Sequence, residues 1–305
     1  MKPDKSKIFP APLKPGDKIA ILSPAGRINP DFVNGAVEVL RAKGWNPVVY
    51  PNALGRHGSY SGSVSQRLGD LEKALLDPEI RAIVCSRGGY GAVHLLEQLD
   101  SLPFEKDPKW IVGFSDISAL HALMASKDIV SIHGPRTKDI TRGGTDDADN
   151  DLLFRILAGE KPEETFPSST YDRPGMAMGT LLGGNLSVLA QLIGTPFNVL
   201  NPDTILFIED VEEPIYKIER ILYQLRLAGI LPELRGLIVG QFTGYKANDN
   251  YRKMEEMIKD MVEPYTYPVA MNVPIGHVDH NIPLISGDFV TLRVTMGENN
   301  SIVYW

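Results

Sequence analysis

The sequence has 305 residues, of which 43% are hydrophobic and 23% charged, values typical of a globular protein with two domains or one large one. The net charge is −7 and no Lys/Arg cluster forms a stripe, which argues against nucleic acid and anionic membranes as partners. Because Cys85 is the single cysteine, the chain has no internal disulfide and no multi-cysteine metal site.

The apolar segments of the chain bear on its location. The first seven residues are polar, and no apolar segment of a signal peptide follows them. No apolar run reaches the length that a membrane-spanning helix needs. We therefore expect a cytoplasmic protein without a membrane partner.

In the first half, short apolar runs alternate with segments of helical periodicity. This alternation is typical of a parallel sheet with helices on both faces, so we predict an α/β domain of the Rossmann or flavodoxin type. The predicted strands are Lys18–Ser23, Pro47–Tyr50, Arg81–Cys85, Trp110–Phe114 and Ile129–Ile132. The predicted helices are Asn29–Lys43, Val64–Leu76, a segment that ends at Leu99, and Ile117–Ala125.

The segment Thr137–Pro174 differs from both halves, with a glycine pair, an acidic run and three prolines around one short helical pattern at Leu152–Leu157. We interpret it as the connection between two domains, an N-terminal domain of residues 1–165, with its linker from about 137, and a C-terminal domain of residues 166–305. The second domain is predicted to be mixed α/β and to end in a β-hairpin. Its predicted elements are Met176–Leu182, Leu186–Ile193, Thr204–Ile208, Ile215–Ala228, Leu237–Gly240, Tyr251–Val262, Asp288–Val294 and Ile302–Trp305.

A serine stands where the fourth predicted strand meets a helix, in Gly113–Ile117. Such a joint lifts a nucleophile clear of the sheet, and the free N–H groups of the first helical turn face developing negative charge. Ser115 is therefore a candidate nucleophile, and the backbone N–H of Asp116 is a candidate oxyanion donor. Taken alone, a helix cap explains the serine better. Ile117 replaces the second glycine of G-x-S-x-G, which argues against an ordinary α/β-hydrolase.

Glycines follow the third predicted strand in Ser86–Gly91. They allow backbone N–H groups to approach an anion or an oxyanion closely, although a tight turn explains them equally well. The segment does not fit G-x-G-x-x-G, because His94 occupies the last position, and no P-loop pattern occurs in the chain. We predict no cofactor.

Acids follow the predicted strand Thr204–Ile208 at the edge where α/β proteins bind ligands. Glu209 or Asp210 could orient a catalytic histidine, and Glu212 and Glu213 are close enough to complicate the choice. Taken alone, a role as caps of the helix that starts near Pro214 explains these acids better.

Six histidines are candidates for a general base, which needs a titratable nitrogen on a positioned loop. His94 and His121 fall in predicted helices, which favours packing or surface roles. His277 follows a strand and a glycine, and His133 is the second candidate. The spacing of His277 and His280 lacks a third ligand nearby, so no metal site is predicted. A cysteine nucleophile at Cys85 is less favoured, because lone cysteines at strand ends are usually buried.

Several motifs in order resemble the LD-carboxypeptidase family of serine peptidases, which includes muramoyl-tetrapeptide carboxypeptidases and microcin C self-immunity proteins. The resemblance runs nearly end to end. The segments that carry it are Leu13–Ala20, Ser23–Gly26, Arg87–Gly91, Gly113–Asp116, Gly183–Ser187, Ile208–Asp210 and Gly276–His277.

The resemblance implies a Ser-His-Glu triad between the two domains. In it Ser115 attacks the scissile carbonyl, His277 transfers the proton, and Glu209 orients the imidazole. Backbone N–H groups of Gly88 or Gly89, together with that of Asp116, are implied as the oxyanion hole. A homodimer is implied as well.

The implied reaction is release of D-alanine from a cytoplasmic murein tetrapeptide, a small peptide substrate with a free carboxylate. Arg87 is a candidate for binding that carboxylate. Two alternatives stay open, a self-immunity hydrolase of a peptidyl-nucleotide and a non-catalytic protein that binds a small molecule. The first alternative needs an aromatic side chain to stack on the base, and none of Trp45, Trp110 and Trp305 is an obvious choice.

Overall fold

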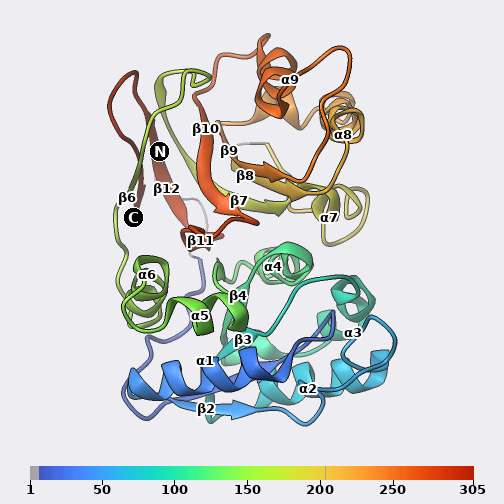
Figure 1. Cartoon of the computed structure of the whole chain (residues 1–305), viewed down its shortest axis with the longest axis vertical. Coiled ribbons are helices and arrows are strands. Elements are labelled where there is room, and N and C mark those ends of the chain that lie inside the picture. The colour runs from blue at the N-terminus through green and yellow to red at the C-terminus, as the bar shows by residue number, and fades with distance from the viewer. Residues whose placement is uncertain (1–6, 203) are drawn as a thin grey trace. The chain divides into compact units, whose positions relative to one another are not determined.

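The chain divides into two compact units in the computed structural model, which describes residues 7–202 and 204–305 (Figure 1). Unit 1 comprises the chain up to Glu160 together with Ile282–Ser286, and unit 2 comprises Lys161–Asn281 with Gly287–Trp305. The boundary predicted from the sequence lies at 165/166, with Ile282–Ser286 in the second domain. The return of this segment to unit 1 rests on strand pairing between Leu284–Ser286 and Ser131–His133, which no local pattern reports.

Unit 1 is built on a six-stranded sheet in the order β11-β5-β4-β3-β1-β2, in which β1 to β5 run parallel and β11 is antiparallel. The order 2-1-3-4-5 is that of flavodoxin-like folds, and it reverses direction between β1 and β3. Right-handed crossovers then put α1 on one face and α2, α3 and α4 on the other. The strands are β1 Lys18–Leu22, β2 Asn46–Val49, β3 Ile80–Cys85, β4 Trp110–Gly113, β5 Ser131–His133 and β11 Leu284–Ser286, and the helices are α1 Pro30–Ala42, α2 Val64–Leu76, α3 Leu96–Asp100 and α4 Ser118–Ser126.

Local sequence explains α2 well. Ser63 caps the helix, with its side chain accepting from the backbone N–H of Gln66 while the Gln66 side chain accepts from Ser63. This capping box satisfies two N–H groups that the first turn leaves open. Its buried positions, which include Leu71, Ala74 and Leu75, recur at helical spacing, so pattern and cap agree on one element.

The predicted linker contains two helices of unit 1, α5 (Thr137–Gly143) and α6 (Ala148–Leu157). Gly144, which suggested a loop, is the C-cap of α5 with φ +68°. The helix packs closely on α1, where Thr141 Oγ1 donates to the carbonyl of Phe32 at 2.6 Å. Gly35 makes this approach possible, because a Cβ there would lie 2.2 Å from Thr141 Cγ2. Tertiary packing, which the local composition does not report, therefore makes this segment helical.

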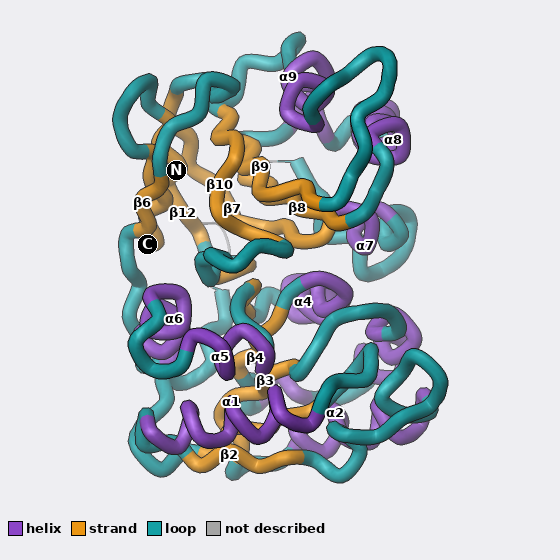
Figure 2. Tube along the Cα trace, in the orientation of Figure 1, coloured by secondary structure: helices purple, strands orange, loops and turns teal. Residues whose placement is uncertain are grey.

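Unit 2 is built on a seven-stranded mixed sheet in the order β10-β9-β8-β7-β12-β13-β6. Strands β7 to β10 are parallel, and each connection moves the same way along the sheet, so α7, α8 and α9 share one face (Figures 1 and 2). The predicted α/β fold class, with its mixed second sheet and terminal hairpin β12–β13, is confirmed. The elements are β6 Glu164–Phe166, β7 Gly175–Asn185, α7 Leu186–Ala190, β8 Thr204–Val211, α8 Ile215–Leu227, β9 Gly236–Thr243, α9 Met254–Val262, β10 Val269–Gly276, β12 Phe289–Val294 and β13 Asn300–Tyr304.

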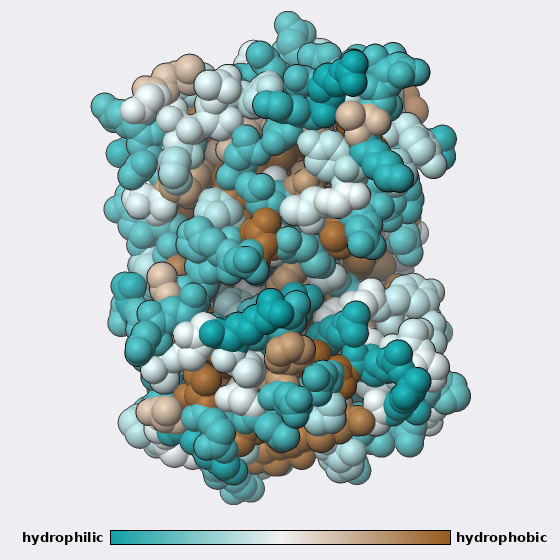
Figure 3. Space-filling model, viewed as in Figure 1, coloured by the Kyte–Doolittle hydropathy of each residue, from teal (hydrophilic) through white to brown (hydrophobic). Residues whose placement is uncertain are grey.

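Hydrophilic residues dominate the face of the molecule in Figure 3, and apolar ones gather only in small patches. Within residues 7–202 and 204–305, no helix combines the length and the apolar character needed to cross a membrane.

Candidate active site

Ser115 stands at a strained joint in unit 1. Strand β4 ends at Gly113, and Ser115 starts a 3₁₀ turn that continues into α4. Its φ of +68° is left-handed, a conformation that costs a residue with a side chain about 1–2 kcal/mol. Two hydrogen bonds hold the backbone just before Ser115, because the carbonyl of Gly113 accepts from His121 Nε2 at 2.8 Å and from the N–H of Gly134 at 3.1 Å. Surrounding contacts thus hold this hydroxyl in its strained position.

The glycine loop after β3 lies directly against Ser115. A Cβ on Gly88 would come within 2.8 Å of Ser115 Cβ, 2.9 Å of its Oγ and 3.1 Å of the backbone nitrogen of Asp116. Only glycine fits there. The N–H of Gly26, in the loop after β1, donates to the carbonyl of Gly88 at 2.9 Å. These loops follow the two strands between which the strand order reverses, the usual ligand site of such sheets.

Three backbone N–H groups are candidates for an oxyanion hole: those of Gly88 and Asp116, which adjoin Ser115, and that of Gly89, which follows Gly88. For Gly88, Gly89 and Asp116, the structure records no acceptor for the N–H among the residues it describes. The Asp116 side chain accepts from the N–H of Ala92 at 2.8 Å. Burial raises the pKa of Asp116, and the bond from Ala92 opposes that shift. This bond ties the glycine loop to the residue that follows the serine.

Arg87, the predicted carboxylate-binding residue, is exposed on the same loop. Its Nη1 donates to the carbonyl of Arg27 at 2.9 Å, so part of the guanidinium fastens two loops together. The rest of the side chain is open to solvent, and its role stays a prediction.

Unit 2 brings Glu209 and His277 together. Glu209 Oε2 accepts from His277 Nδ1 at 2.8 Å, and the carboxylate is fully buried. A carboxylate bonded to Nδ1 puts the imidazole proton on that nitrogen, which leaves Nε2 as the basic atom. Gly276, with φ +117°, makes the contact possible, because a Cβ there would lie 2.9 Å from Glu209 Cβ. No pattern in the sequence indicates this role of Gly276.

An irregularity in the sheet affects the direction of the Glu209 side chain. The register between β8 and β9 shifts between Ile208 and Asp210, so the regular ladder is interrupted at Glu209. The register between β9 and β10 also shifts before Gly276. Such bulges turn side chains out of the alternation of the strand and are frequent next to active sites.

Three of the four acids that the sequence left open have different partners in the structure, and the fourth, Glu212, has a left-handed backbone with φ +60°. Asp210 accepts from Asn185 Nδ2 and from the N–H of Ser187, both at 2.9 Å, and so holds the start of α7. Burial is the main cause of the raised pKa of Asp210. Glu213 pairs with Lys217 at 2.7 Å. Glu209 is therefore the acid of this group that meets a histidine.

Three other candidate residues are buried, which favours structural roles for them. His121 is buried, and burial lowers its pKa to about 4. His133 is also buried, on β5, with its ring centroid 5.7 Å from that of Phe114. Cys85 is buried and its thiol pKa is raised by desolvation, which keeps it protonated and a poor nucleophile.

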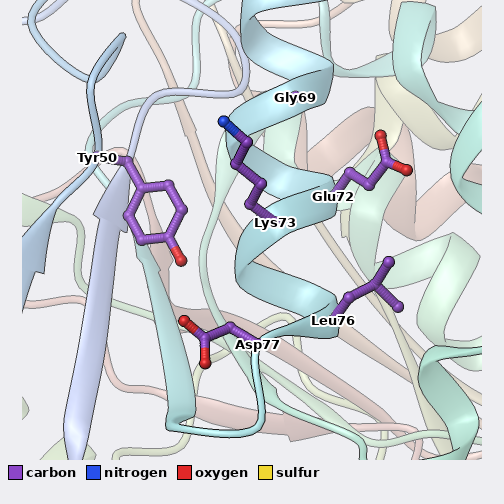
Figure 4. Close-up of a pocket in the computed structure, with 6 residues that line it drawn as sticks. All are labelled: Tyr50, Gly69, Glu72, Lys73, Leu76 and Asp77. Atoms are coloured by element: carbon purple, nitrogen blue, oxygen red, sulfur yellow. The ribbon is translucent and has the colours of Figure 1, made fainter.

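A surface pocket lies beside α2 (Figure 4). It is lined by Tyr50, Gly69, Glu72, Lys73, Leu76 and Asp77. None of these residues belongs to the predicted site. Among the described residues, no group of three or more His, Cys, Asp or Glu side chains could hold a metal ion.

A strained serine with open backbone donors in one unit, and a carboxylate–imidazole pair in the other, are the functional groups of a serine hydrolase. Two family models match this chain, the LD-carboxypeptidase N-terminal domain over residues 19–134 and the LD-carboxypeptidase C-terminal domain over residues 178–292. The chain belongs to the LD-carboxypeptidase family. The predicted family and the predicted enzyme class, a serine-type carboxypeptidase, are confirmed.

Individual relatives agree with this assignment. A probable murein peptide carboxypeptidase of Bacillus subtilis is 31% identical over 287 residues, which cover 91% of this chain and 89% of the relative. The solved muramoyltetrapeptide carboxypeptidase from Oxalobacter formigenes has a TM-score of 0.85 and 28% identity, covering 94% of this chain and 98% of that one. The microcin C7 self-immunity protein MccF has a TM-score of 0.84 at 22% identity, covering 97% and 98%, and shows the shared fold.

Proposed function

We propose that this protein releases the terminal D-alanine of a cytoplasmic murein tetrapeptide with Ser115, His277 and Glu209 as its catalytic triad. The observation that carries the proposal is the 2.8 Å bond between Glu209 Oε2 and His277 Nδ1, which prepares Nε2 as a general base. The strained backbone of Ser115 supports the role of this residue as nucleophile. The names of the Bacillus and Oxalobacter relatives support the substrate.

The proposed reaction proceeds in two halves. His277 Nε2 removes the hydroxyl proton as Ser115 Oγ bonds to the carbonyl carbon on the acyl side of D-alanine. The N–H groups of Asp116 and of Gly88 or Gly89 stabilise the oxyanion, and each such donor contributes about 3 kcal/mol. The C–N bond then breaks, and the D-alanine amine leaves with the proton from His277. Water, deprotonated by the same nitrogen, cleaves the acyl-enzyme and restores the serine.

The alternative substrate is a peptidyl-nucleotide, and the MccF fold is compatible with it. A base-stacking aromatic would favour it. Trp45 and Trp110 are buried, and Trp45 packs edge-on against Phe154 with ring centroids 5.6 Å apart. Trp305 donates to Thr291 Oγ1 at 2.9 Å on the terminal hairpin. The tryptophans therefore give no support to the alternative substrate.

The test is incubation with a tetrapeptide that lacks the disaccharide and ends in D-alanine, with Ser115→Ala in parallel. Release of D-alanine by the unmodified protein alone supports the proposal. Release by both proteins removes Ser115 from the mechanism. Cleavage of an aminoacyl-sulfamoyl-adenosine in place of the tetrapeptide favours the alternative substrate. Failure to react with a serine-directed fluorophosphonate favours the non-catalytic binding protein.

The assembly is a separate part of the proposal. We propose a homodimer, and sedimentation velocity across a concentration series tests it. A single species with the mass of one 33.6 kDa chain at every concentration contradicts the dimer.

A further inference from the structure

An aromatic and basic cluster borders the glycine loop of unit 1. It consists of Tyr60, Arg67, Tyr90 and His94. The ring centroids of Tyr60, Tyr90 and His94 lie 6.0, 5.8 and 5.2 Å apart in pairs, and the guanidinium carbon of Arg67 lies 5.0 Å from the Tyr60 centroid. None of these four residues is among the site residues predicted from the sequence.

Arg67 is the buried member of this cluster, with 1% of its surface exposed. Its Nη1 donates to the carbonyls of Pro24 at 2.6 Å and Gly91 at 2.8 Å, and its Nε donates to the carbonyl of Gly62 at 3.1 Å. These bonds hold the loops after β1 and β3. Within the described residues the hydrogen bonds of Arg67 go to neutral acceptors, and the carboxylate of Asp116 is close enough to favour the charged guanidinium. A buried positive charge therefore lies behind the glycine loop, with Asp116 as an acidic neighbour.

The bond between Arg67 and His94 determines the histidine tautomer. Arg67 Nη2 lies 3.2 Å from His94 Nδ1, and because arginine only donates, Nδ1 must accept. The ring proton is then on Nε2, which lies 3.4 Å from the Tyr90 hydroxyl oxygen. When this oxygen accepts from Nε2, its own proton is directed to another acceptor. Tyr90 is 54% exposed, so a ligand can reach that hydroxyl.

The end of this chain of donors lies on the segment that contacts the nucleophile. Tyr90 follows Gly88 by two residues, and Gly88 packs against Ser115. In a peptide acid, the terminal carboxylate carbon is three bonds beyond the scissile carbonyl carbon, at most about 4 Å away. Donors for that carboxylate must therefore come from segments next to Ser115, as the glycine loop is.

We propose that Arg67, His94 and Tyr90 form a donor chain whose final hydroxyl binds the terminal carboxylate of the substrate, an inference that rests on the proposed function. Tyr90 then determines specificity, because it favours a free peptide acid over the corresponding amide. The buried charge of Arg67 strengthens the chain by polarising it. Arg87 lies on the same loop and is the comparison residue, since its Nη1 is already bonded to Arg27.

The test measures binding without turnover. In a Ser115→Ala background, calorimetry compares a tetrapeptide ending in D-alanine with its C-terminal amide. Tyr90→Phe, which keeps the ring, is expected to weaken binding of the acid about tenfold. Binding of the amide is expected to weaken less, because its oxygen is an uncharged acceptor. Tyr216→Phe is the matched control, because Tyr216 is 55% exposed and also lies beside an arginine, Arg220, at 5.5 Å.

A double-mutant cycle tests whether the residues act as one chain. His94→Leu is expected to weaken acid binding as Tyr90→Phe does, and the combined variant is expected to lose no more than either alone. An unchanged preference for the acid in Tyr90→Phe overturns the inference, and so does a preference that only Arg87→Ala abolishes. Release of D-alanine by the protein with Ser115 intact is measured separately. Its absence contradicts the proposed function, whereas release without a Tyr90 effect contradicts only the donor chain.

Discussion

The two units prepare their reactive groups in different ways. In unit 1 the strain falls on the reactive residue itself, because Ser115 adopts φ +68°. In unit 2 neither Glu209 nor His277 has a positive φ, and the left-handed conformation falls on the adjacent Gly276 at φ +117°. The nucleophile is thus positioned by its own backbone. The acid–base pair is positioned by a hydrogen bond and by the absence of a Cβ at Gly276. Substitutions can separate these two devices.

The largest effect is expected where the charge of the pair is removed. Glu209→Gln keeps the shape but cannot accept the Nδ1 proton as a carboxylate does, so we expect kcat to fall about 10⁴-fold. Glu213→Gln is the control, because Glu213 bonds to Lys217 instead of a histidine. Measured hydrolysis rates that fall equally in both variants contradict the assignment of Glu209.

The packing of Gly276 is the next target. Gly276→Ala places a methyl group 2.9 Å from Glu209 Cβ at a strained φ, and we expect the displaced carboxylate to lower kcat about a hundredfold. Gly297→Ala is the matched control, since Gly297 has φ +78° but open space around the new methyl group. It is expected to lose only the backbone contribution, about 1 kcal/mol of unfolding free energy, with kcat intact. An unchanged kcat in Gly276→Ala contradicts the role of Gly276 in positioning the Glu209–His277 pair.

The support beneath the serine joint predicts a pH dependence of stability. Burial lowers the pKa of His121 to about 4, and the bond that its Nε2 donates to the carbonyl of Gly113 opposes this shift only in part. The folded state therefore holds the ring neutral, 2.9 Å from Ser131 Oγ. The unfolded chain binds a proton at about pH 6.5. The unfolding free energy therefore keeps its full value above pH 6.5, falls as the pH drops, and has lost about 3 kcal/mol below pH 4.

Urea unfolding at several pH values measures this loss. His121→Gln is expected to reduce the slope between pH 6.5 and 4, because the variant has no group to protonate at that position. His57→Gln, which changes an exposed histidine, is expected to leave the slope as it is. Equal slopes in the two variants assign the acid sensitivity to other groups.

Sequence patterns predicted the elements where local signals agree and failed where distant contacts decide. The bounds of α2 were predicted correctly because Ser63 and the apolar spacing point to the same helix. Helix α5 was missed because its stability depends on packing at Gly35, which lies far away in the sequence. Pairing of β11 with β5 is equally invisible to a local pattern.

The candidate site shows the same limit. The motif around Ser115 was visible as a serine at a strand–helix joint, but its positive φ was not. The contact of Glu209 with His277 joins residues 68 positions apart, so only the family resemblance suggested it. Arg67 and His94 were passed over because both fall in helical patterns, where charge and ring are usually surface or packing features. The sequence carries no signal for the burial of Arg67, because Asp70 lies three positions further on and suggests an ordinary surface ion pair.

The smallest expected effect isolates the strain at Ser115. Ser115→Ala keeps a Cβ at φ +68°, whereas Ser115→Gly removes it, and glycine adopts this conformation without a steric penalty. We expect both variants to be inactive. In urea unfolding, the glycine variant is expected to be more stable than the alanine variant by about 1 kcal/mol. This difference is smaller than the steric strain itself, because glycine has greater backbone freedom in the unfolded chain. Ser126, at the end of α4 with an ordinary helical φ, supplies the matched pair, and there glycine is expected to be the less stable of the two. The same sign at both positions means that Ser115 is not strained, and the contrast between the two units then reduces to their hydrogen bonds.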